Sequence, residues 1–235
     1  MALPPEIAGH LNLDGPPVTP RPSATVLLVR GTEPWEVLLV HRPGGADFAP
    51  GAYVFPGGAV HDEDRAWDDQ IAAAAIRETF EETGILLARK GRRFARDAEC
   101  GALRAATGGG RSFAEAMNHL GLCPAFDRLV MFARWVTPAQ LRRRFDARFY
   151  LARMPGGQIV HPQEGEVTDW LWTMPRHALD SPEITLVYAT RAVLESVAGE
   201  PSPRALFERA RRLPEVPIIQ PRVVRTENGW EVVRD

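Results

Sequence analysis

Residues 77–85 read Arg-Glu-Thr-Phe-Glu-Glu-Thr-Gly-Ile, and more of the fold and chemistry can be inferred from this stretch than from any other part of the chain. On a helix that turns about 100° per residue, Glu78, Glu81 and Glu82 fall within an arc of roughly 100°. The apolar side chains of the same stretch centre on the opposite face. The pattern therefore predicts a helix that buries one side, carries three carboxylates on the other and ends at Gly84, which is free to adopt a positive φ.

Three carboxylates on one face repel one another and raise each other's pKa unless a cation lies between them. Hard divalent cations prefer oxygen ligands, so the cluster predicts a Mg²⁺ or Mn²⁺ site. A plain solvated face is the commoner explanation for such a pattern. Two neighbours favour the metal site: Arg77 can hold a carboxylate through two hydrogen bonds, and the turn Phe55-Pro56-Gly57-Gly58 lets the backbone approach a ligand closely.

Gly58 followed by Arg77-Glu78-x-x-Glu81-Glu82-x-Gly84-Ile85 resembles the Nudix box, G-x5-E-x7-R-E-U-x-E-E-x-G-U, where U is a bulky apolar residue. Two departures stand out. The interval from Gly58 to Arg77 is about five residues longer than in the family pattern, and Thr79 replaces the usual apolar residue. Because of the insertion, the early glutamate of the box has two candidates, Glu63 and Asp64.

The resemblance implies an α/β fold: a Nudix-type α/β/α sandwich with a mixed β-sheet and a helical insertion after the Nudix helix. The flanking sequence is similar to the branch of Nudix proteins that act as coenzyme A or acyl-CoA diphosphatases. The segments that carry this similarity lie between residues 24 and 198 and are 55–58, 75–87, 144–152 and 165–167. The coenzyme A signature upstream of the box is matched only in part, at 38–42 and 51–58, and its spacing is one residue short.

The family's site residues transfer to this chain at the matching positions. Glu78, Glu81 and Glu82 are the expected metal ligands, with the Gly58 carbonyl as a further ligand. Arg77 is expected to hold a box glutamate in its working rotamer, and Arg77 and Glu78 count among the catalytic residues.

The expected general base is Glu166, which precedes a predicted strand, and Glu164 is its rival. For the substrate, Arg42 is a candidate phosphate contact and Phe48 a candidate stacking residue. Trp135 and Tyr150 could also stack on a base, although core packing explains them equally well. The arginines at 142–144 could meet phosphates, and an exposed basic turn is the simpler explanation.

The expected organisation is an extended segment at 1–22, a Nudix hydrolase domain at 23–198 with the helical insertion at about 91–127, and a C-terminal extension at 199–235. Predicted strands are 24–30, 35–41, 53–55, 85–88, 129–137, 146–153 and 167–172. Predicted helices, besides the box helix capped by Asp68 or Asp69, are 92–107, 112–120, 175–180 and 182–198. Asn228-Gly229 between alternating runs predicts a terminal hairpin.

The composition is that of an ordinary globular protein, with 45% apolar and 25% charged residues among 235. A net charge of −2 gives no general reason to bind nucleic acid. No apolar run approaches the roughly 20 residues that span a bilayer, and residues 1–21 lack a secretory pattern. Cys100 and Cys123 are expected to be free thiols, and the cytoplasm is the expected compartment. A homodimer is a family-level expectation.

The predicted function is metal-dependent cleavage of a diphosphate in a small molecule, coenzyme A or acyl-CoA first. The alternatives are a Nudix pyrophosphatase acting on ADP-ribose, NADH or nucleoside triphosphates, and a catalytically silent Nudix module that senses a ligand.

Overall fold

The computed structural model describes residues 11–12, 14–45, 50–162, 165, 167–227 and 229–234. The predictions made for Phe48, Glu164, Glu166 and Asn228 lie outside the described residues.

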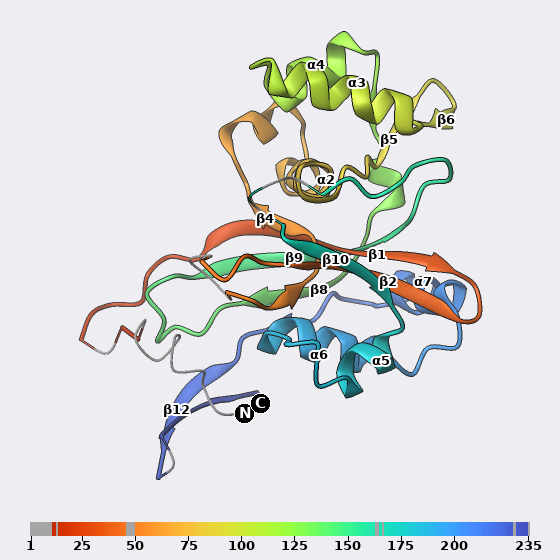
Figure 1. The fold of residues 1–235 in the computed structure, drawn as a ribbon. Helices are drawn as coiled ribbons and strands as arrows, with labels where there is room; N and C mark the ends of the chain where they lie inside the picture. The colour runs from red at the N-terminus through yellow and green to blue at the C-terminus, as the bar shows by residue number, and fades with distance from the viewer. Residues whose placement is uncertain are drawn as a thin grey trace.

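A large mixed sheet forms the centre of the molecule (Figure 1). Its main path runs β10-β2-β1-β9-β8-β11, with β3 added to β2 and β4 added to β1. β1 is parallel to β9 and β11 is parallel to β8, whereas the other pairs are antiparallel. The strands are β1 (Arg21–Gly31), β2 (Trp35–His41), β3 (Tyr53–Val54), β4 (Gly57–Ala59), β8 (Val130–Val136), β9 (Phe145–Arg153), β10 (Asp169–Thr173) and β11 (Ile218–Ile219).

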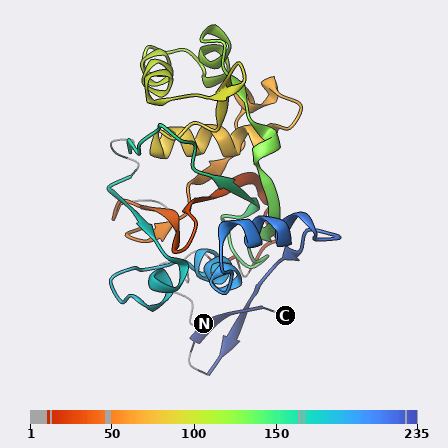
Figure 2. The same cartoon turned by 90° about the vertical axis from the view of Figure 1, so that its right-hand side faces the viewer.

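Helices cover both faces of the sheet (Figures 1 and 2). One face carries α2 (Gln70–Thr83), with α3 (Asp97–Gly108) and α4 (Phe113–His119) stacked beyond it. The other face carries α5 (Pro175–Asp180), α6 (Tyr188–Val197) and α7 (Pro203–Arg211). The predicted α/β/α sandwich with a mixed sheet is confirmed.

The two cores follow from the alternation of side chains along β1. Val26 and Leu28 are buried in the cluster beneath α2, and Leu27 and Val29 are buried in the cluster beneath α6 and α7. Successive residues of a strand point to opposite faces, so a central strand covered on both sides reads as a continuous apolar run. β1 thereby holds both helical layers in one structure.

The box helix α2 begins and ends at the residues expected from the sequence. Asp69 is the N-cap, and its side chain accepts a hydrogen bond from the amide of Ala72. Gly84 ends the helix with φ of 73°, and its amide donates to the Phe80 carbonyl. A side chain at Gly84 would also overlap the guanidinium of Arg104 on α3. The insertion therefore packs directly against the end of α2.

The strand predicted at 85–88 is wrong in position, because β5 covers Ala88–Lys90. The backbone of Leu86 instead bonds a side chain: its amide donates to Gln158 Oε1 at 2.8 Å, and its carbonyl accepts from Gln158 Nε2 at 3.0 Å. β5 pairs with β6 (Arg93–Phe94) and β7 (Cys123–Pro124) in a small separate sheet. Two 3₁₀ turns, η1 (Asp62–Ala66) and η2 (Phe126–Arg128), complete this region.

Two helices begin several residues later than predicted, and a third was not predicted. α3 begins at Asp97 rather than 92, because 93–94 form β6. α6 begins at Tyr188 rather than 182, since the preceding residues run beside β3, where the Tyr53 amide donates to the Thr185 carbonyl. α7 was not predicted, although Ser202 caps it and Pro203 opens it.

The C-terminal hairpin is confirmed as β12 (Arg222–Thr226) paired with β13 (Gly229–Val233). Cys100 and Cys123 are free thiols, as expected. Within the described ranges, no helix is both long and apolar enough to cross a membrane. The division of the chain into the predicted segments stays a prediction.

Candidate active site

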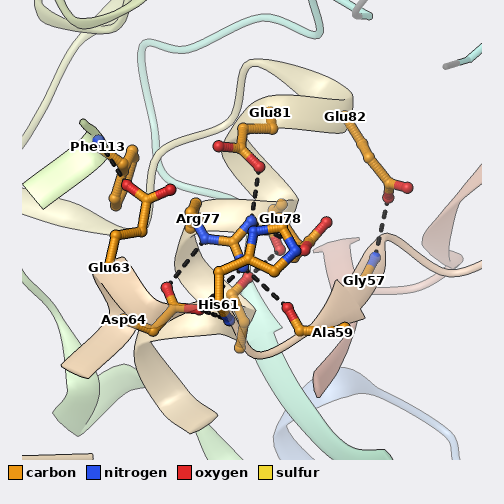
Figure 3. A network of polar contacts seen from close by, with 12 residues as sticks. Gly57, Ala59, His61, Glu63, Asp64, Arg77, Glu78, Glu81, Glu82 and Phe113 are labelled. Carbon is orange, nitrogen blue, oxygen red and sulfur yellow. Dashed lines mark hydrogen bonds and ion pairs between the residues drawn. The ribbon is translucent and has the colours of Figure 1, made fainter. Parts of the chain in front are cut away.

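The glycine turn lies directly beneath the carboxylates of α2 (Figure 3). The amide of Gly57 donates to Glu82 Oε2 at 2.9 Å. The carboxylate of Glu78 occupies the space where a Cβ on Gly58 would stand. Only glycine admits this approach, because any side chain at position 58 would displace Glu78. The glycine turn and the carboxylates of α2 are therefore in direct contact, as the sequence predicted.

Arg77 organises the site from the inside. Its side chain is fully buried, and it donates to Glu78 Oε1 at 2.9 Å, to Glu81 Oε2 at 2.8 Å and to the Ala59 carbonyl at 3.0 Å. Two further bonds of 2.9 Å reach the carboxylate of Asp64. Burial opposes the charge of Arg77, but these hydrogen bonds and the nearby carboxylates outweigh it and raise the pKa above its ordinary value. Arg77 is therefore a permanent cation here.

The structure separates the roles of Glu63 and Asp64. Asp64 is completely buried and pairs with Arg77, whereas Glu63 accepts a hydrogen bond from the amide of Phe113, the first residue of α4. Five residues separate Gly58 from Asp64, which matches the first interval of the family pattern. The extra residues therefore lie between Asp64 and Arg77, in the stretch that includes the end of η1 and the start of α2. The spacing from Gly58 could have identified Asp64 from the sequence.

Glu81 has a raised pKa. Burial is the main cause, the charge of Arg77 acts in the opposite direction, and Glu78 raises it again. About a third of the Glu81 side chain is exposed. A cation arriving at this face would stabilise the ionised form and so relieve the cost of holding these charges together.

The described residues do not form a finished metal site. Among them, no group of three or more His, Cys, Asp and Glu side chains is gathered closely enough to hold one ion. The reason is visible in Figure 3: Glu78 and Glu81 both turn to Arg77, while Glu82 turns to Gly57. The oxygen donors nevertheless suit a hard cation chemically, and Glu78 and Glu82 both lie against the glycine turn.

The remaining predicted residues have separate positions. Arg42 is half-buried directly after β2, and its amide donates to the Ala52 carbonyl. Trp135 and Tyr150 are buried, which favours core packing over base stacking. Arg144 contradicts the expected exposed turn: it is buried, and its guanidinium donates to the carbonyls of Val18 and Thr137.

Sequence reasoning missed the residues that hold the segment before β10. The amide of His161 donates to the Thr83 carbonyl at 2.7 Å, one residue past Glu82. Gln158 is buried and bonds the backbone of Leu86 and Ala95. No recognisable motif marks either residue.

A cavity of about 440 Å³ lies beside this segment, on the α2 side of the sheet. Its walls are the end of β1, residues 153–160, and the indoles of Trp170 and Trp172 on β10. The guanidinium of Arg30 lies 4.4 Å from the centre of the Trp172 ring and is paired with Glu36. None of the α2 carboxylates lines this cavity.

Comparison with known proteins identifies the family. Residues 68–189 match the NUDT19 Nudix domain. The chain is 30% identical over 161 residues to a Caenorhabditis elegans protein named "Putative nudix hydrolase 7". The aligned region covers 68% of this chain and 53% of that protein. The chain thus spans about half the length of this curated relative.

A crystal structure of a NUDIX hydrolase from Alicyclobacillus acidocaldarius is similar, with a TM-score of 0.67 and 30% identity over 81% of this chain and 96% of that one. The match to the NUDT19 Nudix domain covers more than half of the sequence, and the box residues are assembled around one glycine turn. The chain belongs to the Nudix hydrolase family.

Proposed function

We propose that this protein hydrolyses a diphosphate linkage in a small molecule with the help of Mg²⁺ or Mn²⁺. The observation that carries the proposal is the arrangement of Glu78 and Glu82 against Gly57 and Gly58, organised by the buried cation of Arg77. Family membership supports the same reaction class. Glu78, Glu81, Glu82 and the Gly58 carbonyl are the proposed ligands. A divalent cation bound there would polarise phosphoryl oxygens and lower the pKa of a bound water.

We assign the general base to Glu166, with Glu164 as its rival. Such a base must come within a hydrogen bond of the attacking water. The support comes from the chain on either side: His161 is tied to Thr83 at the end of α2, and Thr168 is tied to His41 at the end of β2.

The proposed substrate is coenzyme A or an acyl-CoA, cleaved at its diphosphate to a phosphopantetheine and an adenosine bisphosphate. The resemblance of the flanking sequence to that branch supports the choice. The indole-lined cavity supports it further, since it offers an uncharged chain a groove on the same face of the sheet as α2. Arg42 and Phe48 remain the proposed contacts to the phosphates and to the base.

The deciding experiment is product identification after incubation of the protein and Mg²⁺ with coenzyme A, ADP-ribose and NADH. Release of phosphopantetheine from coenzyme A supports the proposal. Turnover of ADP-ribose or NADH without turnover of coenzyme A would contradict the proposed substrate and would favour a nucleotide pyrophosphatase instead. Absence of hydrolysis with every diphosphate, together with saturable binding of one of them, would favour the silent sensing module.

The cytoplasm and a homodimeric state belong to the proposal as well. Two free thiols agree with a reducing compartment. Fractionation of the source cells and light scattering of the purified protein test these two points.

A further inference from the structure

The helical insertion is connected to the active site through Glu63, the neighbour of Asp64 in η1. Glu63 Oε2 accepts a hydrogen bond from the amide of Phe113 at 2.8 Å, whereas Asp64 pairs with Arg77 (Figure 3). Phe113 belongs to α4 and lies 50 residues further along the chain than Glu63. Two consecutive side chains of η1 therefore join the insertion to the buried cation that organises the site.

The ring of Phe113 packs where η1 meets α2. It is buried, and its centre lies 5.8 Å from that of the Phe80 ring on α2 and 6.1 Å from that of the Trp67 ring at the end of η1. The extra residues of the box loop lie between Asp64 and Arg77, and a longer connection restricts the positions of its two ends less. Phe113 bridges this connection from outside, through its ring and through its amide.

Arg104 on α3 gives the insertion a second contact with α2. Its guanidinium lies 6.0 Å from the centre of the Phe80 ring and occupies the space where a Cβ on Gly84 would stand. Phe80 directly precedes Glu81 and is in contact with both helices of the insertion. The insertion therefore packs against the turns of α2 that carry the three carboxylates.

Glu63 also acts on Glu81 through its charge. Burial is the largest cause of the raised pKa of Glu81, and the negative charge of Glu63 adds to it. The hydrogen bond of Glu63 and its charge are therefore two separate effects. Glutamine at this position distinguishes them, because it keeps an acceptor oxygen and lacks the charge.

We infer that Glu63 is a positioning residue through which the helical insertion holds η1, and with it the pair of Asp64 and Arg77, in the place that orients the carboxylates of α2. Arg77 donates to Glu78 and Glu81, so a shift of η1 reaches both side chains through Asp64. In this role Glu63 acts through other side chains and not on the reacting atoms. The inference rests on the proposed function, because the carboxylates that it orients are the proposed metal ligands.

The test uses the full chain and three variants. Glu63→Ala removes the hydrogen-bond acceptor, whereas Glu63→Gln keeps an acceptor oxygen and removes the charge. Glu115→Ala is the matched control, because Glu115 Oε2 accepts from the amide of Ser112, the residue before Phe113. This control also removes a carboxylate bond at the beginning of α4, but it removes no bond to η1.

Three quantities are measured for each variant and for the wild type. The first is amide hydrogen exchange of the peptide spanning 59–69 in the metal-free protein. The second is Mn²⁺ affinity by calorimetry, and the third is steady-state kinetics with coenzyme A. The exchange measurement needs neither metal nor substrate, so it reports on η1 alone.

In Glu63→Ala we expect exchange in that peptide to be about tenfold faster, as the loss of one hydrogen bond implies. Mn²⁺ affinity and kcat should each fall by about tenfold with KM within about twofold, because the carboxylates are displaced and the substrate contacts are not. Glu63→Gln and Glu115→Ala should stay within about threefold of the wild type in all three measurements.

Four results would overturn the inference. Unchanged exchange in Glu63→Ala would show that the bond does not hold η1. Faster exchange with wild-type kcat and Mn²⁺ affinity would leave a purely structural contact. An equal loss of kcat in Glu63→Gln would assign the effect to the charge of Glu63, and an equal loss in Glu115→Ala would assign it to the stability of α4.

Failure of the proposed function would give different results. If the wild type cleaves another diphosphate and not coenzyme A, the substrate assignment is wrong, and the kinetic comparison uses that diphosphate. If the wild type binds Mn²⁺ and cleaves no diphosphate, the reaction is wrong, while exchange and Mn²⁺ affinity still test the role of Glu63. A wild type that neither cleaves a diphosphate nor binds Mn²⁺ would overturn both, because Glu63 would then have no cation site to position.

Discussion

Asp64 and Arg77 form an ion pair with two hydrogen bonds of 2.9 Å, and both side chains are completely inaccessible to solvent. The pair joins η1 to α2 across the loop that is longer than the family pattern allows. Because Arg77 also donates to Glu78 and Glu81, the position of the carboxylate face depends on Asp64.

Asp64→Ala should therefore destabilise the fold, since it leaves a buried guanidinium without its main partner. Removal of one member of a buried pair costs about 3–5 kcal/mol. Urea unfolding of the metal-free protein measures the loss. Asp62→Ala is the control, because Asp62 pairs with Arg65 at the surface with its side chain 91% exposed, and it should leave the unfolding midpoint unchanged. Equal midpoints for the two variants would contradict the role assigned to Asp64.

Gly58→Ala should abolish most of the activity with the fold intact. The new methyl group would overlap the Glu78 carboxylate and push it off the turn. A displacement of about 1 Å at a reacting centre can cost about 100-fold in rate, and kcat should fall by that order. Gly199→Ala, where no atom lies within 4 Å of the added carbon, is the matched control. A near-normal kcat in Gly58→Ala would contradict a role of the glycine turn in the active site.

The sequence was sufficient for the parts of the site that are local. α2, its caps and the turn at Gly57 are each determined by a few neighbouring residues, and they lie as predicted. The contacts of Gln158, His161 and Thr168 join segments far apart in the chain, and a side chain that replaces a strand partner, as Gln158 does at Leu86, leaves no periodic pattern. The same reason explains the misplaced strand at 85–88.

Glu82→Gln should separate metal binding from folding. The glutamine oxygen can still accept the Gly57 amide, so the turn should survive, while the negative charge is lost. We expect weaker Mn²⁺ binding by calorimetry and a fall in kcat of about 100-fold, with an unchanged circular dichroism spectrum. EDTA should abolish hydrolysis by the wild type, and added Mg²⁺ should restore the activity. Wild-type Mn²⁺ affinity in this variant would disprove the ligand assignment.

The raised pKa of Glu81 predicts a pH dependence of stability in the metal-free protein. Its ordinary value is 4.5, and the folded value lies above it. The folded state therefore binds this proton more tightly. The stabilising contribution is fully present below pH 4.5 and is lost as the pH rises through the folded value. Glu81→Gln should accordingly gain stability relative to the wild type when the pH is raised from about 4 to about 7.

Urea unfolding in EDTA at the two pH values measures this difference, and Glu195→Gln on the exposed side of α6 controls for the loss of one carboxylate. Parallel pH profiles for the wild type and Glu81→Gln would contradict the raised pKa of Glu81.

For the proposed acyl-CoA substrate, the cavity beside β10 predicts a dependence of KM on the length of the acyl chain. Trp170 and Trp172 line it together with residues 153–160, and the charge of Arg30 is already paired with Glu36, so an uncharged chain suits it best. Trp170→Ala removes an apolar wall and should raise KM for a long-chain acyl-CoA by about tenfold, as the loss of roughly 1.4 kcal/mol of burial implies, while KM for free coenzyme A stays constant. Trp230→Ala in the C-terminal hairpin is the matched control. An equal rise in KM for both substrates would show that the acyl chain binds outside this cavity, because only a ligand that fills the cavity loses contacts when Trp170 is removed.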